Sequence, residues 1–170
     1  MITAIDLARY VVARTNKIDH GVNLLKLQQI LYFIQAEFLT VFDRPCFCDL
    51  IEAKKFGIRI YPVYLEFLGH GAGRIWYWEE HHPEWLDLNV TLDEKNHIDR
   101  VICKLLPYSG IELVRIIQNQ DPWKKTYEEV PLCPAVSGYA ADRGDRDGCD
   151  RNQLLVRLYR RRRRDHAGHG

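Results

Sequence analysis

The chain has 170 residues, of which 46% are hydrophobic and 28% charged, and its formal net charge is +1. This composition is typical of one globular domain with a real core, and the length is too short for two comfortable domains. No apolar run approaches the roughly 18 residues that span a bilayer, and Asp6 interrupts the start where a signal peptide would be apolar. Five cysteines without framework spacing favour free thiols over disulfides. We therefore expect a cytoplasmic protein without membrane contact.

The charge is unevenly distributed along the chain. Residues 1–137 hold 15 Lys and Arg against 18 Asp and Glu, whereas residues 138–170 hold 9 against 5. The second part is rich in Gly, Asp and Arg and has no apolar period, so it cannot bury enough surface to offset the entropy of ordering. The sequence predicts a folded domain over 1–137 and a disordered basic tail over 138–170.

The strongest periodic segment runs from Asn23 to Phe42 and contains neither Gly nor Pro. Its apolar residues recur at steps of three and four, which predicts a central helix capped by Asn23 and covered on more than one side. Few side chains remain for water, and we expect them on the solvated edge of the helix: Lys26, Gln28, Gln29, Gln35 and Glu37. A first helix precedes it, capped by Thr3 with Asp6 and ending near Asn16.

After the central helix the pattern becomes shorter and mixed. Alternation within residues 46–60 predicts a short β pair around Gly57, followed by a short helix from Pro62 to Leu68. Capping boxes at Thr91 and Ser109 then predict two helices that form a helical hairpin over residues 91–120. We expect residues 121–123 to end the second of them and to pack an indole back on the core. The fold class expected is mainly α, a single compact helical domain with one short β pair.

The sequence contains only weak indications of a catalytic or metal site. His70, His81, His82 and Glu84 are close in sequence, but a structural zinc site usually needs four well-spaced ligands, and the cysteines at 46 and 48 have the wrong spacing. Nothing in the sequence activates a thiol at Cys46, Cys103 or Cys133, and the glycine-rich segment 69–73 lacks the Lys and Ser or Thr of a P-loop. We expect no enzymatic activity, no metal and no cofactor.

Three groups of side chains suggest binding instead. An aromatic group is either a satellite hydrophobic cluster or a partner-binding anchor: Trp76, Tyr77, Trp78 and Trp85. A basic patch of Lys54, Lys55 and Arg59 suits an acidic protein partner. The run from Arg160 to Arg164 would give weak, nonspecific contact with nucleic acid, because the body is acidic and has no helix-turn-helix signature.

Four strings taken together resemble one family. They are AIDLARYV at the start, LLKLQQILYFIQAEFL in the central helix, IEAKKFGIRIYPVYLEF after it, and DPWKKTY near residue 121. Their types and order are similar to those of the Panacea-domain proteins, also called the SocA-like antitoxin family and found in the phage-associated GepA proteins. The resemblance covers residues 2–127, about three-quarters of the chain, and rests on the order of the strings rather than on any single one.

The resemblance assigns the family's motif positions to particular residues of this chain. Lys54 departs from the family, which usually has Trp there, and Ile58 with Arg59 replaces the family's Pro-Val, so we expect the binding surface along residues 52–64 and an altered partner. The positions that match are Lys26, Leu27, Gln28, Tyr32, Glu52, Ala53, Phe56, Gly57, Val63, Tyr64, Asp121, Pro122 and Trp123.

The resemblance implies a protein that works by binding. Panacea domains are similar to the antitoxin half of toxin–antitoxin pairs, often carried by prophages, and neutralise a neighbouring toxin by direct contact without a cofactor. We therefore expect an antitoxin with a cognate toxin as its partner. The alternatives left open are a nucleic-acid-binding regulator, a proteolytic adaptor, and assembly as a homo-oligomer.

Overall fold

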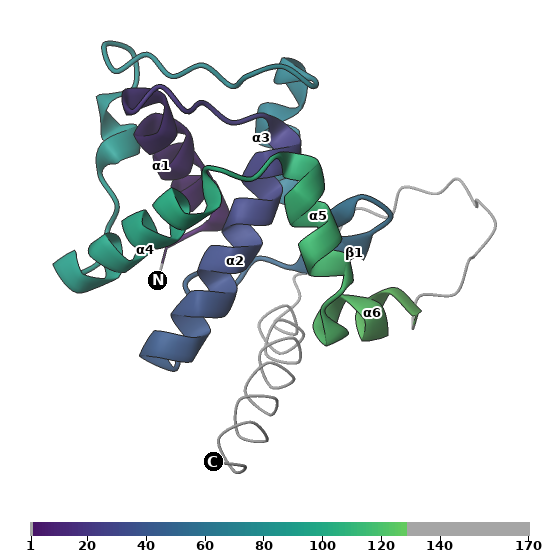
Figure 1. The fold of residues 1–170 in the computed structure, drawn as a ribbon. Coiled ribbons are helices and arrows are strands. Elements are labelled where there is room, and N and C mark those ends of the chain that lie inside the picture. Colours follow the sequence, from purple (N-terminus) through teal and green to yellow (C-terminus); the bar gives the residue numbers. More distant parts are fainter. Residues whose placement is uncertain (1, 129–170) are drawn as a thin grey trace, which may run out of the picture.

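The fold is built around one central helix. It is seen in a computed structural model that describes residues 2–128, and Figure 1 shows α2 (Leu24–Phe42) with α1 (Ala4–Lys17) and α4 (Leu92–Leu105) to one side and α5 (Gly110–Gln118) to the other. All three helices pack against α2. The predicted fold class, mainly α with one short β pair, is confirmed. The predicted boundary at 137 and the tail over 138–170 lie outside the described residues.

The central helix begins and ends where the sequence indicates. The Asn23 side chain accepts a hydrogen bond from the backbone N–H of Lys26 at 2.9 Å, and Asp43 closes the helix in the left-handed conformation with a φ of 58°. The assignment of its polar edge was wrong, however, because three glutamines are buried: Gln28, Gln29 and Gln35. Conversely the apolar Val41 is 53% exposed near the end of the helix.

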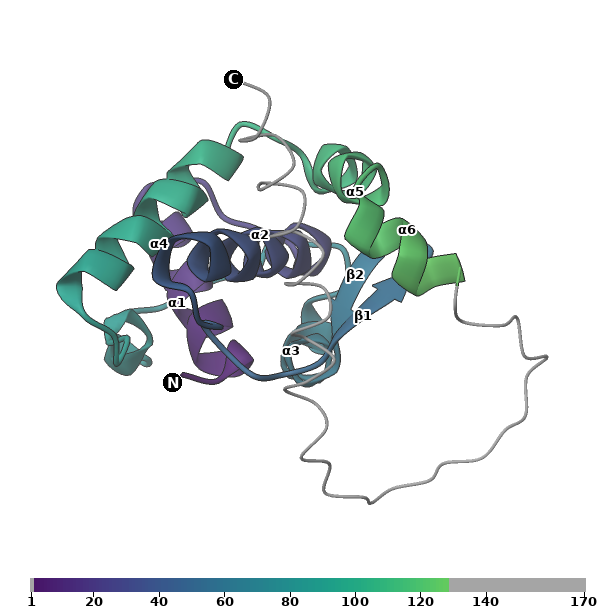
Figure 2. The ribbon, with the colours of Figure 1, turned by 90° about the horizontal axis from the view of Figure 1, so that it is seen from below.

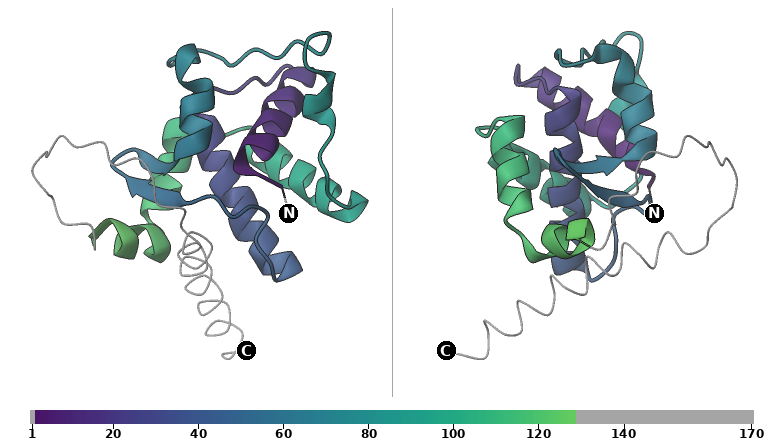
Figure 3. Two further views of the ribbon diagram at one scale, coloured as in Figure 1. Left: turned by 180° about the vertical axis from the view of Figure 1, so that it is seen from behind. Right: turned by 90° about the vertical axis from the view of Figure 1, so that its right-hand side faces the viewer.

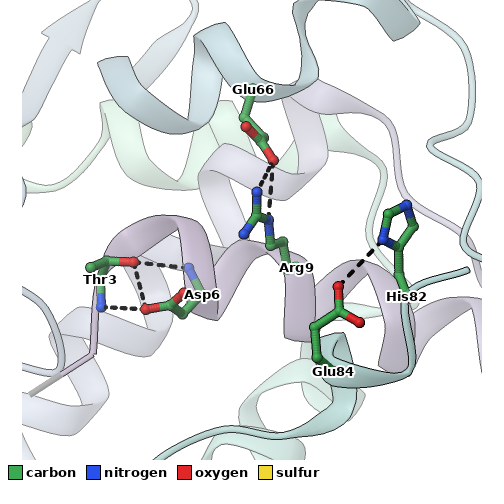
Figure 4. A network of polar contacts seen from close by, with 6 residues as sticks. All are labelled: Thr3, Asp6, Arg9, Glu66, His82 and Glu84. Carbon is green, nitrogen blue, oxygen red and sulfur yellow. Dashed lines mark hydrogen bonds and ion pairs between the residues drawn. The ribbon is translucent and has the colours of Figure 1, made fainter.

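Local capping sets the starts of the other long helices. Thr3 and Asp6 exchange both hydrogen bonds of a capping box at α1, as Figure 4 shows, and complete boxes also start α4 at Thr91 and α5 at Ser109. The predicted helical hairpin over residues 91–120 is only partly right. Both helices form, but each takes α2 as its main packing partner, so they straddle the central helix (Figure 2).

A small hairpin covers the remaining part of α2. Strands β1 (Ile51–Lys54) and β2 (Gly57–Ile60) pair antiparallel, with Ile51 opposite Ile60 and Lys54 opposite Gly57. Helix α3 (Tyr61–Phe67) follows directly and has Pro62 in its first turn, where the missing N–H costs nothing. Two short 3₁₀ turns, η1 (Leu68–His70) and η2 (Pro83–Leu86), flank the loop that leads to α4. Figure 3 shows the hairpin beside α2 from two further sides.

The chain continues past α5 into a helix that the sequence did not indicate. Asp121 and Pro122 open α6 (Asp121–Glu128) instead of merely closing the helix before them. Proline is tolerated in a first helical turn, and the acidic residue suits that end of the helix dipole. The predicted return of the Trp123 indole is confirmed, because its side chain packs against the hydrophobic core. Within residues 2–128, no helix combines the length and the apolar character needed to cross a membrane.

Candidate functional site

Buried glutamines tie the central helix to the hairpin. The Gln28 amide oxygen accepts from the backbone N–H of Ile60 at 2.8 Å, and its nitrogen donates to the carbonyl of the same residue at 3.3 Å. The Gln29 oxygen accepts from the N–H of Ile58 at 3.3 Å. Further along α2, the Gln35 amide oxygen accepts from the backbone N–H groups of residues 46 and 47, in the segment that precedes the hairpin. Gln28 thus has a structural role, because it joins α2 to β2.

A positional signal for these glutamines exists in the sequence. Gln28 follows Leu24 by four residues, and Gln35 follows Leu31 by four, so both lie on the buried stripe of the helix. The prediction of a solvated edge followed the polarity of these side chains and not their position on the helix. A buried amide is acceptable there because the facing backbone groups satisfy both its donor and its acceptor.

Two other motif positions meet at the turn of the hairpin. Gly57 has a φ of +93°, and a Cβ placed on it would come within 2.5 Å of the Gln29 amide oxygen. The indole N–H of Trp123 donates to the Gly57 carbonyl at 2.7 Å, and the Gln118 amide donates to the carbonyl of Lys55 at 2.8 Å. Three strings far apart in the sequence therefore converge on one turn.

Lys26 and Tyr32, both candidate partner contacts, hold the helices together. The Lys26 ammonium donates to the carbonyl of Leu106 at the end of α4 at 2.7 Å, and its burial lowers its pKa. Tyr32 is buried, and its hydroxyl donates to the side-chain oxygen of Gln120 at 2.8 Å. Pro122 is buried as well, whereas Asp121 is exposed.

A groove of about 570 Å³ opens between the start of α2, the hairpin and α3. Five of the candidate residues line it: Gln28, Lys54, Phe56, Arg59 and Tyr64. Leu24, Leu25 and Ile58 add aliphatic surface, and the Phe56 ring at the tip of the turn is 69% exposed. A large exposed aromatic ring beside an apolar groove is typical of a protein-binding surface.

The rim of the groove is basic. Lys54, Lys55 and Arg59 lie there, and among residues 2–128 the carboxylate of Glu52 pairs with two of them, at 2.9 Å from Arg59 and 3.5 Å from Lys54. These four side chains together carry a charge of +2. The Arg59 guanidinium also lies 5.5 Å from the Tyr61 ring centroid and 5.7 Å from the Tyr64 ring centroid. The predicted basic patch and the predicted binding segment 52–64 thus lie on one surface.

Two residues of the aromatic group pack against the core, and the other two are exposed. Tyr77 and Trp85 are partly buried and pack against the core, with stacked rings 5.7 Å apart. They form a satellite cluster, completed by His82 stacked on Trp85 at 4.9 Å. Trp76 and Trp78 are 54% and 62% exposed. These two remain available to a partner.

Ion pairs join the elements around that cluster. Arg9 on α1 pairs with Glu66 on α3 at 2.5 Å, and its guanidinium lies 5.8 Å from the Trp85 ring centroid. The His82 ring is 3.3 Å from the Glu84 carboxylate. Figure 4 shows both pairs beside α1. His82 and Glu84 are both exposed, so this pair lies on the surface of the protein.

The candidate metal-binding and catalytic side chains do not gather at one place among the described residues. Within residues 2–128, no three His, Cys, Asp or Glu side chains gather closely enough to hold a metal ion. Burial raises the pKa of the Cys46 thiol to about 12, which keeps the thiolate scarce at neutral pH. Cys103 is exposed on α4, and Cys133 lies outside the described residues.

A second hollow lies where α4 and α5 pack on either side of α2. Its volume is about 210 Å³, and Phe33, Leu105, Tyr108 and Ile116 supply most of its apolar lining. Glu37 and Lys104 lie at this hollow, 3.9 Å apart. This hollow could not be predicted from the sequence, because it depends on where two helices diverge.

Comparison of the chain with protein-family models, with curated proteins and with solved structures finds no match. The resemblance to Panacea-domain proteins accordingly stays a prediction.

Proposed function

We propose that this protein is an antitoxin that neutralises a cognate toxin by direct binding, in the cytoplasm and as part of a prophage or other mobile element. It acts by contact and needs no catalytic group or cofactor. The proposal draws on the resemblance to the Panacea-domain family and on the groove, and the groove is the observation that carries it.

The groove favours a partner segment with apolar side chains and carboxylates. Leu24, Leu25 and Ile58 offer aliphatic contact, and Phe56 provides an aromatic ring that a partner can cover. The local charge of +2 attracts an acidic segment and repels a basic one, which supports selectivity as well as a faster encounter. The residues that depart from the family, Lys54 and Arg59, are part of this basic rim, which suits a partner unlike those of the relatives.

Co-expression with the neighbouring reading frame tests the function. We expect that frame to stop growth when it is expressed alone, and growth to return when this protein is present. If no adjacent gene becomes toxic in the absence of this protein, the antitoxin proposal fails.

Variants of the groove then test the site. Lys55 and Phe56 are exposed, so Lys55→Glu combined with Phe56→Ser removes charge and aromatic contact at little cost to folding. Loss of one hot-spot contact of about 2 kcal/mol corresponds to roughly 30-fold weaker binding of the toxin. The matched control is Arg115→Glu, an exposed charge reversal on α5. Equal affinity of the groove variant and the control for the toxin would place the binding surface elsewhere.

A further inference from the structure

Residues 74–78 form an extended segment whose side chains alternate between the core and the surface. Ile75 is fully buried and Tyr77 packs against the core, whereas Trp76 and Trp78 are exposed. The backbone is held in place, because the N–H of Ile75 donates to the carbonyl of Val22 at 2.8 Å. Residues 74, 76 and 78 therefore share one face by the period of two of an extended chain.

The shared face carries a row of a guanidinium and two indoles. Arg74 lies 4.4 Å from the centroid of the Trp76 ring, and the Trp76 and Trp78 rings stack with centroids 6.3 Å apart and planes at 22°. Arg74 is fixed by Asn16 and by Asp19, whose carboxylate is 3.2 Å away. The row thus begins with Arg74, which lies over the Trp76 ring, and ends at Trp78, which is 62% exposed.

The surroundings of this row are acidic. The loop residues 75–90 contain four Asp and Glu, at positions 79, 80, 84 and 87, and neither Lys nor Arg. Glu79 pairs with Lys17 on α1 at 2.8 Å, while Glu80 and Asp87 are exposed on the same loop. A guanidinium that reached Trp78 would find an aromatic face and carboxylates together, the two partners that arginine prefers.

We propose that the arginine run of this same chain, Arg160–Arg164, docks on the row formed by Trp76 and Trp78 and on the acidic residues beside it. The run supplies five adjacent guanidinium groups, and Arg74 on Trp76 already shows how this surface accepts one. The proposal is independent of the groove and of the antitoxin function. It implies that the run is withheld from nucleic acid at low salt.

The length of the chain permits this contact. Residues 129–159, which are 31 residues, separate the last described helix from the arginine run. At about 3.3 Å a residue they reach roughly 100 Å when extended. A compact domain of this size has a radius of gyration of about 14 Å, so any part of its surface lies within reach.

Indole N–H resonances of the full-length protein test the proposal. Wild type is compared at about 50 mM salt with a variant in which Arg160–Arg164 are all replaced by Gln, with Trp78→Phe used for assignment. We expect the Trp78 resonance to shift between the two proteins, and the difference to disappear at about 1 M salt, where screening acts within roughly 3 Å. The Trp123 indole, bonded to the Gly57 carbonyl, should not move.

A peptide and a control variant test whether the arginine run itself makes this contact. A peptide of residues 154–165, added to the Gln variant, should restore the wild-type resonance. Replacement of Arg143, Arg146 and Arg151 by Gln is the control and should leave Trp78 unchanged. An identical Trp78 resonance in wild type and the five-Gln variant overturns the proposal. A shift that grows with protein concentration also overturns it, because the occupant would then be a second copy.

Discussion

Gly57 is the residue at which the central helix, the hairpin and α6 meet. Its φ of +93° is strained for any residue with a side chain, and an added Cβ would lie 2.5 Å from the Gln29 amide oxygen and 3.1 Å from a methyl group of Val114. We expect Gly57→Ala to lower the free energy of unfolding by about 2 to 3 kcal/mol, as measured by urea denaturation.

Gly69→Ala is the matched control. A Cβ placed on Gly69 would have no heavy atom of residues 2–128 within 4 Å, and the φ of Gly69 is not in the left-handed region. This variant should keep the stability of wild type to within about 0.5 kcal/mol. A similar loss in both variants would show that the conformation of Gly57 is not what limits the substitution.

Residues whose roles depend on near neighbours were predictable from the sequence. Thr3, Thr91 and Ser109 each bond to a partner three residues away, so their capping follows from spacing alone. The role of Gln28 depends on Ile60, 32 residues further along the chain. No local pattern contains that information.

At the scale of elements, the side-chain amides of two glutamines on α2 hydrogen-bond the backbone of β2. Gln28→Ala would leave the N–H and carbonyl of Ile60 without their present partner in a buried site, a cost of about 1 to 3 kcal/mol for each unpaired group. We expect Gln28→Ala to destabilise the protein by about 2 kcal/mol or more and to speed amide exchange of Ile60 above that of α4.

Thr40→Ala on the same helix removes a hydrogen bond without touching the hairpin. The Thr40 hydroxyl donates to the carbonyl of Ala36 within α2. This control should cost little and leave exchange at Ile60 unaltered. Exchange at Ile60 that is equally slow in Gln28→Ala would mean that the hairpin does not rely on this glutamine.

The arrangement of elements was harder to predict than their existence. The sequence indicated α2, the β pair and the two helices after Thr91, because periodicity and capping are local. It did not indicate that α4 and α5 lie on different sides of α2. That choice depends on which apolar faces fit together, and on contacts such as Lys26 with the Leu106 carbonyl.

For the molecule as a whole, His97 couples folding to pH. It is 8% exposed, packs edge-on against Phe42, and its Nε2 atom has no hydrogen-bond partner among residues 2–128. Burial lowers its pKa below the ordinary 6.5 and Arg100 adds to this effect, while Glu37 opposes it. The unfolded chain then binds the proton more readily, so the free energy of unfolding falls as pH drops through about 6.5.

His97→Gln should flatten that dependence between about pH 7.5 and 5, measured by urea denaturation at each pH. His20→Gln, an exposed histidine, is the control and should keep the slope of wild type. An unchanged slope in His97→Gln would assign the pH dependence to other groups. The carboxyl of Glu112 titrates in a separate range, because hydrogen bonds from Ser109 lower its pKa, and its contribution is lost only below its ordinary value of 4.5.

The glutamines of α2 also determine how the small sheet can grow. An edge strand normally offers free N–H and carbonyl groups on which another chain can build, and this is a common route to aggregation. Along β2, the N–H groups of Ile58 and Ile60 are already taken by Gln29 and Gln28. Strand addition along β2, by a partner or by a second copy, is therefore blocked by the protein's own central helix.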